Sequence, residues 1–340
     1  MNKIYKSNKY NEYGWLINKI LIILFMLYSY LYFIKKKIAI KISDFSYDII
    51  IPISQRDIKS FIQHKFFYEK YINYSNIVII GSNKTEELLK KETSIKFINE
   101  NELVEKKNIN KFLNETKFIT TIKDGWYEQQ FLKMAYARIC QKKYYLVWDA
   151  DTIPIKSFKM FKNNKPIFDM KTEHHIPYFN TMKKLIFGLK FANRSYISEH
   201  MMIKTEFMID LLDTIEKNDK LTGTFFWEKI LTAIDINNIS NSGFSEYETY
   251  GSFVDTKYPN YYIHRNWSSR RDIGYYFMNS NNLTKNDISW LSLDYYALSF
   301  EKWANFNKNN YKIIKNKSLR KFMRPIQLFN KYKKKFIKNL

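Results

Sequence analysis

The chain has 340 residues, 45% of them hydrophobic, which is enough for one large domain or two ordinary ones with a sizeable core. Its formal charge is +23, but residues 302–340 hold 13 Lys and Arg with no acid, and residues 1–41 carry a net +7. Only +3 is left for residues 42–301. A protein that follows a phosphate backbone needs basic residues on its folded body, so we expect no nucleic acid partner. The single cysteine, Cys140, excludes an intrachain disulfide.

The first predicted element is Trp15–Ile34, the most apolar segment of the chain. Its 20 residues match the hydrocarbon core of a bilayer, and lysines flank it on both sides. No small-residue cleavage site follows, so we interpret it as an uncleaved signal anchor of a single-pass membrane protein, with a buried core helix as the alternative. The lysines on both sides leave the orientation poorly determined. Residues 35–46 read as a short basic stem.

Strand and helix patterns then alternate along the chain. Continuous apolar runs, one closed by Pro52, are typical of buried parallel strands, and helical spacing of apolar residues lies between them. The predicted strands are 47–54, 76–82, 94–100 and 144–148, and the predicted helices are 61–72, 85–92 and 125–140. This alternation predicts an α/β domain with a mostly parallel central sheet flanked by helices.

No internal linker is visible, so residues 47–300 are expected to form one domain. Residues 301–340 are basic with interspersed Ile, Leu and Phe. This composition suits an amphipathic segment that lies on an anionic membrane. The alternative is a solvated, partly disordered tail.

Two aspartates follow the last predicted strand, in the stretch YYLVWDADTIPI. Asp149 and Asp151 are spaced i, i+2, and side chains at this spacing point to the same face of a strand. Two carboxylates held together repel each other and need a cation between them. Mn²⁺ or Mg²⁺ fits, because both ions prefer oxygen ligands and keep positions open for phosphate oxygens. The pattern D-x-D is weak alone, and a solvated turn is the alternative.

The same stretch resembles the W-D-[AS]-D-T-I-P signature of a glycosyltransferase-like domain family of unknown function. The resemblance covers roughly residues 47–275 and includes further blocks, IIIPISQRD, DGWYEQQFLK, YISEHMMI, WEKIL and FSEYETYGSFV. It implies a GT-A-type glycosyltransferase fold and supplies no substrate. Together with the D-x-D pair, it leads us to expect a metal-dependent transferase. Such an enzyme, of the hexosyltransferase class, would move a sugar from a nucleotide-sugar donor to a glycan, lipid or protein acceptor.

Several other positions become candidates in that light. In this fold type the loop after the first strand meets the nucleotide, so Arg56 could pair with a phosphate and Asp57 with ribose or base. Arg270 and Arg271 could belong to a basic loop that closes over the diphosphate, and His264 could complete the metal coordination. For each of them a surface or packing role is the alternative.

Carboxylates and aromatic rings suggest an acceptor side. Glu246 is a candidate general base, and the alternative for its neighbour Glu248 is a helix cap with Ser245. Glu199 is the second catalytic candidate. The candidate sugar or acceptor ligands are His175, His200 and Tyr250.

Two other classes compete with a transferase. A phosphatase of the haloacid-dehalogenase type also has an apolar run before D-x-D, but Ile153 stands where that motif needs Thr or Val. A catalytically degenerate, membrane-tethered sugar-binding protein is the non-enzymatic alternative.

Overall fold

The computed structural model describes residues 24, 45–117, 124–240 and 242–337. The chain divides into two units, residues 1–45 and 46–340, and the second unit contains the whole buried hydrophobic core of the described residues. This unit can therefore be studied by itself. The predicted anchor is, except for Leu24, outside the described residues, as is most of the predicted stem, and both stay predictions. Among the described helices, none has the length and apolar character needed to cross a membrane.

The centre of the second unit is a five-stranded sheet with the order β3-β2-β1-β4-β8. All neighbouring pairs in it are parallel except β4 with β8, which is antiparallel. Every residue of β1, β2, β4 and β8 is buried, which explains why these strands read as continuous apolar runs. The prediction of a mostly parallel central sheet in an α/β domain is confirmed. The strands are β1 (Tyr47–Pro52), β2 (Ile77–Gly81), β3 (Ile95–Asn99), β4 (Tyr144–Trp148) and β8 (His200–Lys204).

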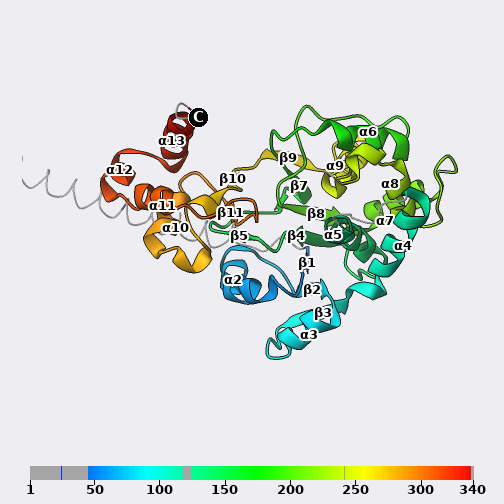
Figure 1. Ribbon diagram of the computed structural model, residues 1–340, viewed down its shortest axis with the longest axis horizontal. Coiled ribbons are helices and arrows are strands. Elements are labelled where there is room, and N and C mark those ends of the chain that lie inside the picture. Colours follow the sequence, from blue (N-terminus) through cyan, green and yellow to red (C-terminus); the bar gives the residue numbers. More distant parts are fainter. Residues whose placement is uncertain (1–23, 25–44, 118–123, 241, 338–340) are drawn as a thin grey trace, which may run out of the picture. The chain divides into compact units, whose positions relative to one another are not determined.

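Helices flank this sheet, with α2 and α5 on opposite sides of it (Figure 1). In α2 the buried side chains recur three or four positions apart, because one stripe of the helix faces the sheet. The helix predicted to end at Cys140 ends earlier, at Ala135, and a 3₁₀ turn over Tyr136–Arg138 leads toward β4. These helices are α2 (Ile58–Tyr71), α3 (Asn83–Leu89), α4 (Lys106–Lys117), α5 (Asp124–Ala135), α6 (Ile176–Leu185), α7 (Thr205–Glu216), α8 (Phe226–Ala233), α9 (Glu246–Lys257) and α10 (Lys285–Leu291).

A small sheet with the order β10-β11-β5 braces the turn that follows β4. Here β11 pairs antiparallel with β5, with Ser299 opposite Thr152. The N–H of Phe300 donates to the carbonyl of Asp151 at 2.8 Å, so a segment far along the chain holds this turn. The strands are β5 (Thr152–Pro154), β10 (Ser269–Arg270) and β11 (Ala297–Ser299), and another sheet contains β6 (Phe161–Lys162), β7 (Lys165–Met170) and β9 (Ile263–Asn266).

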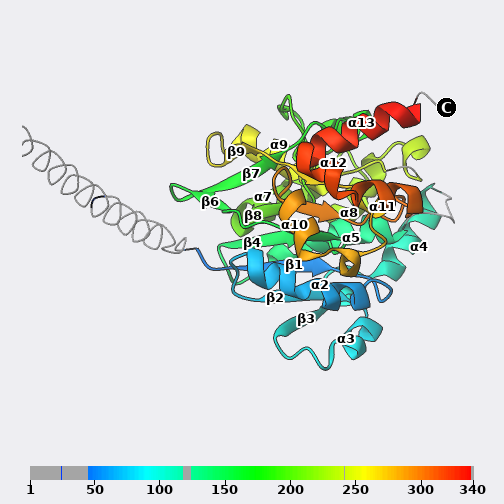
Figure 2. The same cartoon turned by 90° about the vertical axis from the view of Figure 1, so that its left-hand side faces the viewer.

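The C-terminal segment differs from the separate tail predicted after residue 300. It forms α11 (Lys308–Ile314), α12 (Lys317–Phe322) and α13 (Pro325–Ile337), which pack on the same unit (Figure 2). Ile314, Leu328 and Phe329 are buried in one cluster with Ile153, the residue that follows Thr152 in β5. Amphipathic helices bury their apolar stripe wherever a partner surface exists, and here the partner is the domain itself.

Candidate active site

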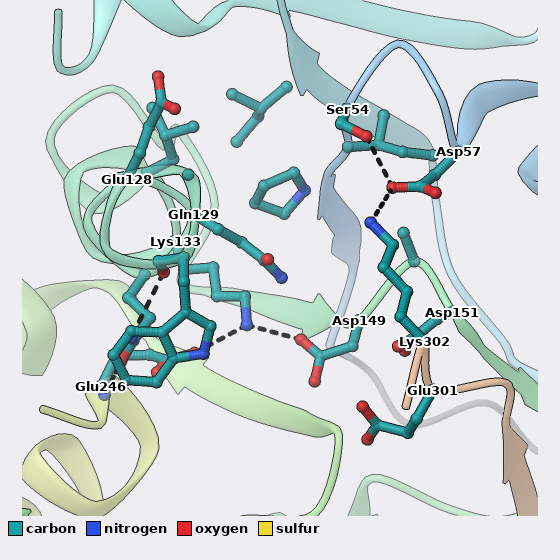
Figure 3. Close-up of a pocket in the computed structure, with 18 of the residues that line it drawn as sticks. Ser54, Asp57, Glu128, Gln129, Lys133, Asp149, Asp151, Glu246, Glu301 and Lys302 are labelled. Carbon is teal, nitrogen blue, oxygen red and sulfur yellow. Dashed lines mark hydrogen bonds and ion pairs between the residues drawn. The ribbon is translucent and has the colours of Figure 1, made fainter. Parts of the chain in front are cut away.

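A cavity of about 820 Å³ opens at the carboxyl ends of the strands of the central sheet. Pro52, Ser82, Glu100 and Asp149, which end or follow β1, β2, β3 and β4, all line it. Side chains of α5 and α9 and the segment 300–303 complete the wall (Figure 3). Ligands of open α/β sheets bind at this edge, so the cavity is the candidate active site.

The side chains that line the cavity carry more negative than positive charge. Eight are acidic and five are Lys or Arg, although the whole chain has a formal charge of +23. The cavity lining therefore has an excess of negative charge, which disfavours an anionic ligand that enters without a cation. The acids are Asp57, Glu100, Glu128, Asp149, Asp151, Glu173, Glu246 and Glu301, and the bases are Arg56, Lys106, Lys133, Arg271 and Lys302.

Asp149 and Asp151 both lie in the cavity wall, on the turn between β4 and β5. The main chain fixes this turn from two sides, since the N–H of Asp149 donates to the carbonyl of Glu199 at 3.0 Å and the carbonyl of Asp151 accepts from Phe300. The Asp149 carboxylate accepts from Lys133 Nζ at 2.6 Å and from the Tyr247 hydroxyl at 3.1 Å. Its charge is thus compensated by a neighbouring ammonium.

Asp151 has no such compensation within the described part of the chain. Its carboxylate accepts one hydrogen bond, from the Thr152 hydroxyl at 3.2 Å. Burial, together with the nearby charges of Glu301 and Asp149, raises its pKa to about 7. A carboxyl group in this state gains most from a cation placed beside it.

Lys133 is the central residue of the site, and the sequence patterns did not single it out. It lies on α5, is 4% exposed, and reaches Asp149 Oδ1 at 2.6 Å and Glu246 Oε1 at 2.7 Å. Its ammonium also lies over the ring of Tyr247, 4.6 Å from the centroid. Although burial disfavours the charged ammonium, the two carboxylates raise the pKa of Lys133 above its usual value. The available signal was a lysine inside the apolar run of the predicted helix 125–140.

Glu246 begins α9 and points toward Lys133, as Figure 3 shows. Its N–H donates to the side-chain oxygen of Gln130 at 3.1 Å. Gln130 and Lys133 both lie on α5, so this helix positions the main chain of Glu246 as well as its carboxylate. Burial raises the pKa of Glu246, and the charge of Lys133 opposes that shift. Glu246 therefore remains a candidate for acid–base chemistry.

Glu248, two residues further along α9, has a different environment. Its N–H donates to the capping hydroxyl of Ser245 at 3.3 Å, and its carboxylate accepts from Ser195. It does not line the cavity, although burial raises its pKa to about 7. The main-chain contact of Glu248 is therefore the helix cap with Ser245 that the sequence analysis gave as the alternative.

The loop after β1 lies in the cavity wall, as expected for Arg56 and Asp57. The Asp57 carboxylate accepts from the Ser54 hydroxyl at 2.6 Å and from Lys302 Nζ at 3.2 Å. Lys302 thereby joins the C-terminal segment to this loop. The exposed Arg56 has no ion pair among the described residues, so its guanidinium can reach a ligand.

The neighbouring residues Arg270 and Arg271 have different environments. Arg271 lines the cavity and donates to Glu301 and to Glu173, each at 2.7 Å. Arg270 does not line the cavity; it pairs with Asp272 and lies over the ring of Phe329 at 4.2 Å. We therefore keep Arg271 as a ligand candidate and assign Arg270 a packing role beneath the C-terminal helices.

Glu199 lies behind the cavity rather than in its wall. It is 3% exposed and accepts from Lys171 and from the Ser269 hydroxyl at 2.7 Å. Its φ of 64° is in the left-handed region, which costs about 1–3 kcal/mol and persists only where the surroundings impose it. Because its carbonyl holds the N–H of Asp149, Glu199 is a positioning residue and not the catalytic residue predicted.

The predicted histidine and tyrosine ligands are likewise outside the cavity lining. His200 is buried against Trp148, and its ring contacts the Asp169 carboxylate at 2.9 Å. Tyr250 is buried and bonds to the Tyr262 hydroxyl at 3.0 Å. Both side chains serve the core, so we withdraw them as substrate ligands.

His175 and His264 are the other two predicted ligands that do not reach the cavity lining. His175 precedes α6 and contacts the Ser242 carbonyl at 3.0 Å. His264, on β9, pairs with Asp255 at 2.7 Å and is therefore not a third ligand beside Asp149. Among the described residues, no group of three or more His, Cys, Asp or Glu side chains is arranged to hold a metal ion.

The family of unknown function DUF6492 matches residues 48–308. This chain belongs to that family. The match extends past the predicted resemblance and includes β11 and the segment 300–303 of the cavity wall. No curated protein matches the chain.

Three solved structures illustrate the likenesses found. The galactosyltransferase LgtC, in complex with donor and acceptor sugar analogues, has 10% identity over 74% of this chain and 86% of that chain, with a TM-score of 0.37. The bifunctional glycosyltransferase WbbM has 9% identity over 85% of this chain and 52% of that chain, with a TM-score of 0.39. The glycosyltransferase GlyE of Streptococcus pneumoniae has 10% identity over 86% of this chain and 64% of that chain, with a TM-score of 0.35.

Proposed function

We propose that this protein is a divalent-cation-dependent glycosyltransferase that uses a nucleotide-sugar donor. The observation that carries the proposal is the acidic cavity at the carboxyl edge of the sheet, with the uncompensated Asp151 beside Asp149. A nucleoside diphosphate is an anion, and this cavity repels an anion unless a cation enters with it. The predicted role of Asp149 and Asp151 as metal ligands is part of this proposal.

The donor set fits Mn²⁺ or Mg²⁺. Hard ions of this kind bind through one or two carboxylates and complete their shell with water and phosphate oxygens. Asp151 accepts only one hydrogen bond, and Asp149 uses Oδ1 for Lys133 and Tyr247, so its other oxygen is open. When bound, the ion would neutralise the diphosphate leaving group as a Lewis acid.

The remaining side chains divide the work. Arg56 and Arg271 offer guanidinium groups to the diphosphate, and Arg271 must release Glu173 or Glu301 to do so. Lys133 holds the carboxylates of Asp149 and Glu246 in place through its two ion pairs. Glu246 is the proposed general base for the acceptor hydroxyl, since burial raises its pKa toward the range that suits proton transfer.

The donor test uses residues 46–340, the unit with its own core. A panel of nucleotide sugars is incubated with Mn²⁺, and release of free nucleoside diphosphate is measured. We expect turnover of one donor class that stops when the divalent ion is chelated. Turnover of p-nitrophenyl phosphate instead would support the phosphatase, and tight sugar binding without any turnover would support the degenerate binding protein.

A further inference from the structure

The outward side of the C-terminal helices carries unpaired positive charge. Lys317 and Lys321 of α12 and Lys331, Lys333 and Lys334 of α13 are exposed, and we call these five residues the basic face. None of them forms an ion pair within the described part of the chain, and residues 302–340 contain no acid. The basic face is therefore a surface without its own counter-charge.

Other basic residues of the same segment have a different task. Arg320 pairs with Asp287 at 2.6 Å, Lys315 pairs with the same carboxylate, and Arg324 pairs with Asp294. These contacts and the buried Leu328 and Phe329 fix the helices on the domain. The basic face is thus presented by a docked structure rather than by a loose tail, which lowers the entropy lost when it binds a partner.

Two large apolar side chains stand out among these lysines. Phe322, at the end of α12, is 79% exposed, and Ile326, near the start of α13, is 45% exposed. The apolar side of both helices already faces the core, so these two residues have no packing role in the domain. Apolar side chains beside lysines suit the boundary between lipid headgroups and acyl chains, where each group finds a matching environment.

From these contacts we infer that the basic face, with Phe322 and Ile326, docks the protein on an anionic lipid surface. A nucleic acid is the other polyanion to consider, but its readers rely on arginine for bases and on several aromatic platforms for single strands. Here both arginines are paired with acids of the domain, Arg320 with Asp287 and Arg324 with Asp294. Among the described side chains of the two helices, Phe322 is the only exposed aromatic residue. The predicted anchor at Trp15–Ile34 points to the same partner, because a tethered domain needs only modest surface affinity.

This inference does not depend on the proposed transferase activity, since none of the residues involved lines the cavity. Purified residues 46–340 are sedimented with phosphatidylcholine vesicles that do or do not contain phosphatidylserine, at low and at physiological salt. Binding should require phosphatidylserine and fall with salt. The triple variant K331A/K333A/K334A should bind roughly 100-fold more weakly at low salt, at about fivefold per lysine near the surface.

A matched control removes the same charge elsewhere. Lys90, Lys91 and Lys96 are exposed and unpaired among the described residues and belong to the region of α3 and β3, away from α13 (Figure 2). K90A/K91A/K96A should bind the vesicles like the unmodified protein. F322S should lose about tenfold at both salt concentrations, because burial of an apolar side chain is not screened. Thermal unfolding of each variant checks that the fold is intact.

Three results overturn the inference. The first is equal binding to neutral vesicles, and the second is an equal loss of binding by the α3–β3 control, which would indicate a response to net charge alone. The third is displacement from the vesicles by single-stranded RNA at equal phosphate concentration, which would assign the surface to nucleic acid.

Discussion

The cavity and the basic face handle charge in opposite ways. In the cavity, acids outnumber bases, and a buried ammonium, Lys133, is shared by two carboxylates. On the basic face, exposed lysines have no acid partner within the described residues. The formal charge of +23 describes neither region. The difference teaches that the cavity charges are coupled to folding and chemistry, whereas those of the basic face are free for a partner.

The strongest test of this contrast is chemical. Glu246→Gln keeps size and hydrogen bonding but removes the proton acceptor, so single-turnover transfer should fall by roughly 10²–10⁴-fold while donor affinity stays normal. The control is Glu248→Gln, an equally buried carboxyl group on the same helix that lies outside the cavity lining. It should change transfer by no more than a few-fold. Transfer by Glu246→Gln within a few-fold of the unmodified rate would make Glu246 a structural residue.

Stability should separate the two kinds of lysine. Lys133→Met leaves the buried Glu246 and the partly buried Asp149 without their cation, so the free energy of unfolding should fall by about 3–5 kcal/mol. Lys331→Met, on the basic face, should stay within about 0.5 kcal/mol. Urea unfolding measures both.

The double variant K133M/E246Q sharpens this result. Because the two residues touch, its loss should be smaller than the sum of the single losses. A loss below about 1 kcal/mol for Lys133→Met alone would contradict the idea that the cavity charges are coupled to folding.

Asp151→Asn tests the cation requirement of the acidic region. Loss of the Asp151 carboxylate should weaken Mn²⁺-dependent nucleotide binding by more than about 100-fold. Even removal of a residue that only supports a metal ligand typically lowers metal affinity or activity by about 10–100-fold. Asp219→Asn is the control, because that carboxylate is exposed and unpaired among the described residues. Calorimetry with UDP and GDP gives the affinities. Unchanged Mn²⁺-dependent affinity in Asp151→Asn would remove Asp151 as a metal ligand.

Per pH unit, the smallest expected effect is a pH dependence of stability. The pKa of Asp151 rises on folding from 3.8 to about 7, so between these values the native state binds more protons than the unfolded state. The free energy of unfolding should therefore fall as pH rises through this window, by up to about 1.4 kcal/mol per pH unit. Glu248, with a pKa of about 7, adds a slope of the same sign.

The two contributions can be told apart. Asp151→Asn and Glu248→Gln should each remove one of them, and Mn²⁺ should cancel only that of Asp151. Urea titrations at several pH values, with and without Mn²⁺, provide the measurement. A slope that Mn²⁺ leaves unchanged would place Asp151 away from the ion.

The sequence predicts the central sheet well, because strands buried on both faces leave continuous apolar runs such as Tyr144–Trp148. It also places Asp149 and Asp151 correctly in a cavity at a strand end. It marks Lys133 only weakly, as a lysine inside an apolar run, because a lysine on a helix is normally solvated and only the tertiary neighbours Asp149 and Glu246 explain its burial.

The other differences have a common physical origin. His200, Tyr250 and Glu199 are buried polar residues whose hydrogen-bond partners are Asp169, Tyr262 and the Asp149 main chain, respectively. A residue type alone does not distinguish such a contact from a ligand. The C-terminal helices were predicted as a tail because their lysines dominate the composition, while the few buried residues that dock them, such as Leu328, are spaced too widely to stand out.

The pairing of β11 with β5 determines how late in synthesis the turn after β4 can be completed. The hydroxyls of Thr152 and Ser299 meet across a separation of 147 residues. At a ribosomal rate of about 5–20 residues per second, roughly 7–30 s pass between the emergence of Thr152 and that of its partner. During this interval the turn with Asp149 and Asp151 lacks its brace, and the segment 300–303 of the cavity wall does not yet exist. The cavity of a nascent chain is therefore incomplete until almost all of the chain has been translated, and a premature stop before Ser299 leaves the turn without its brace.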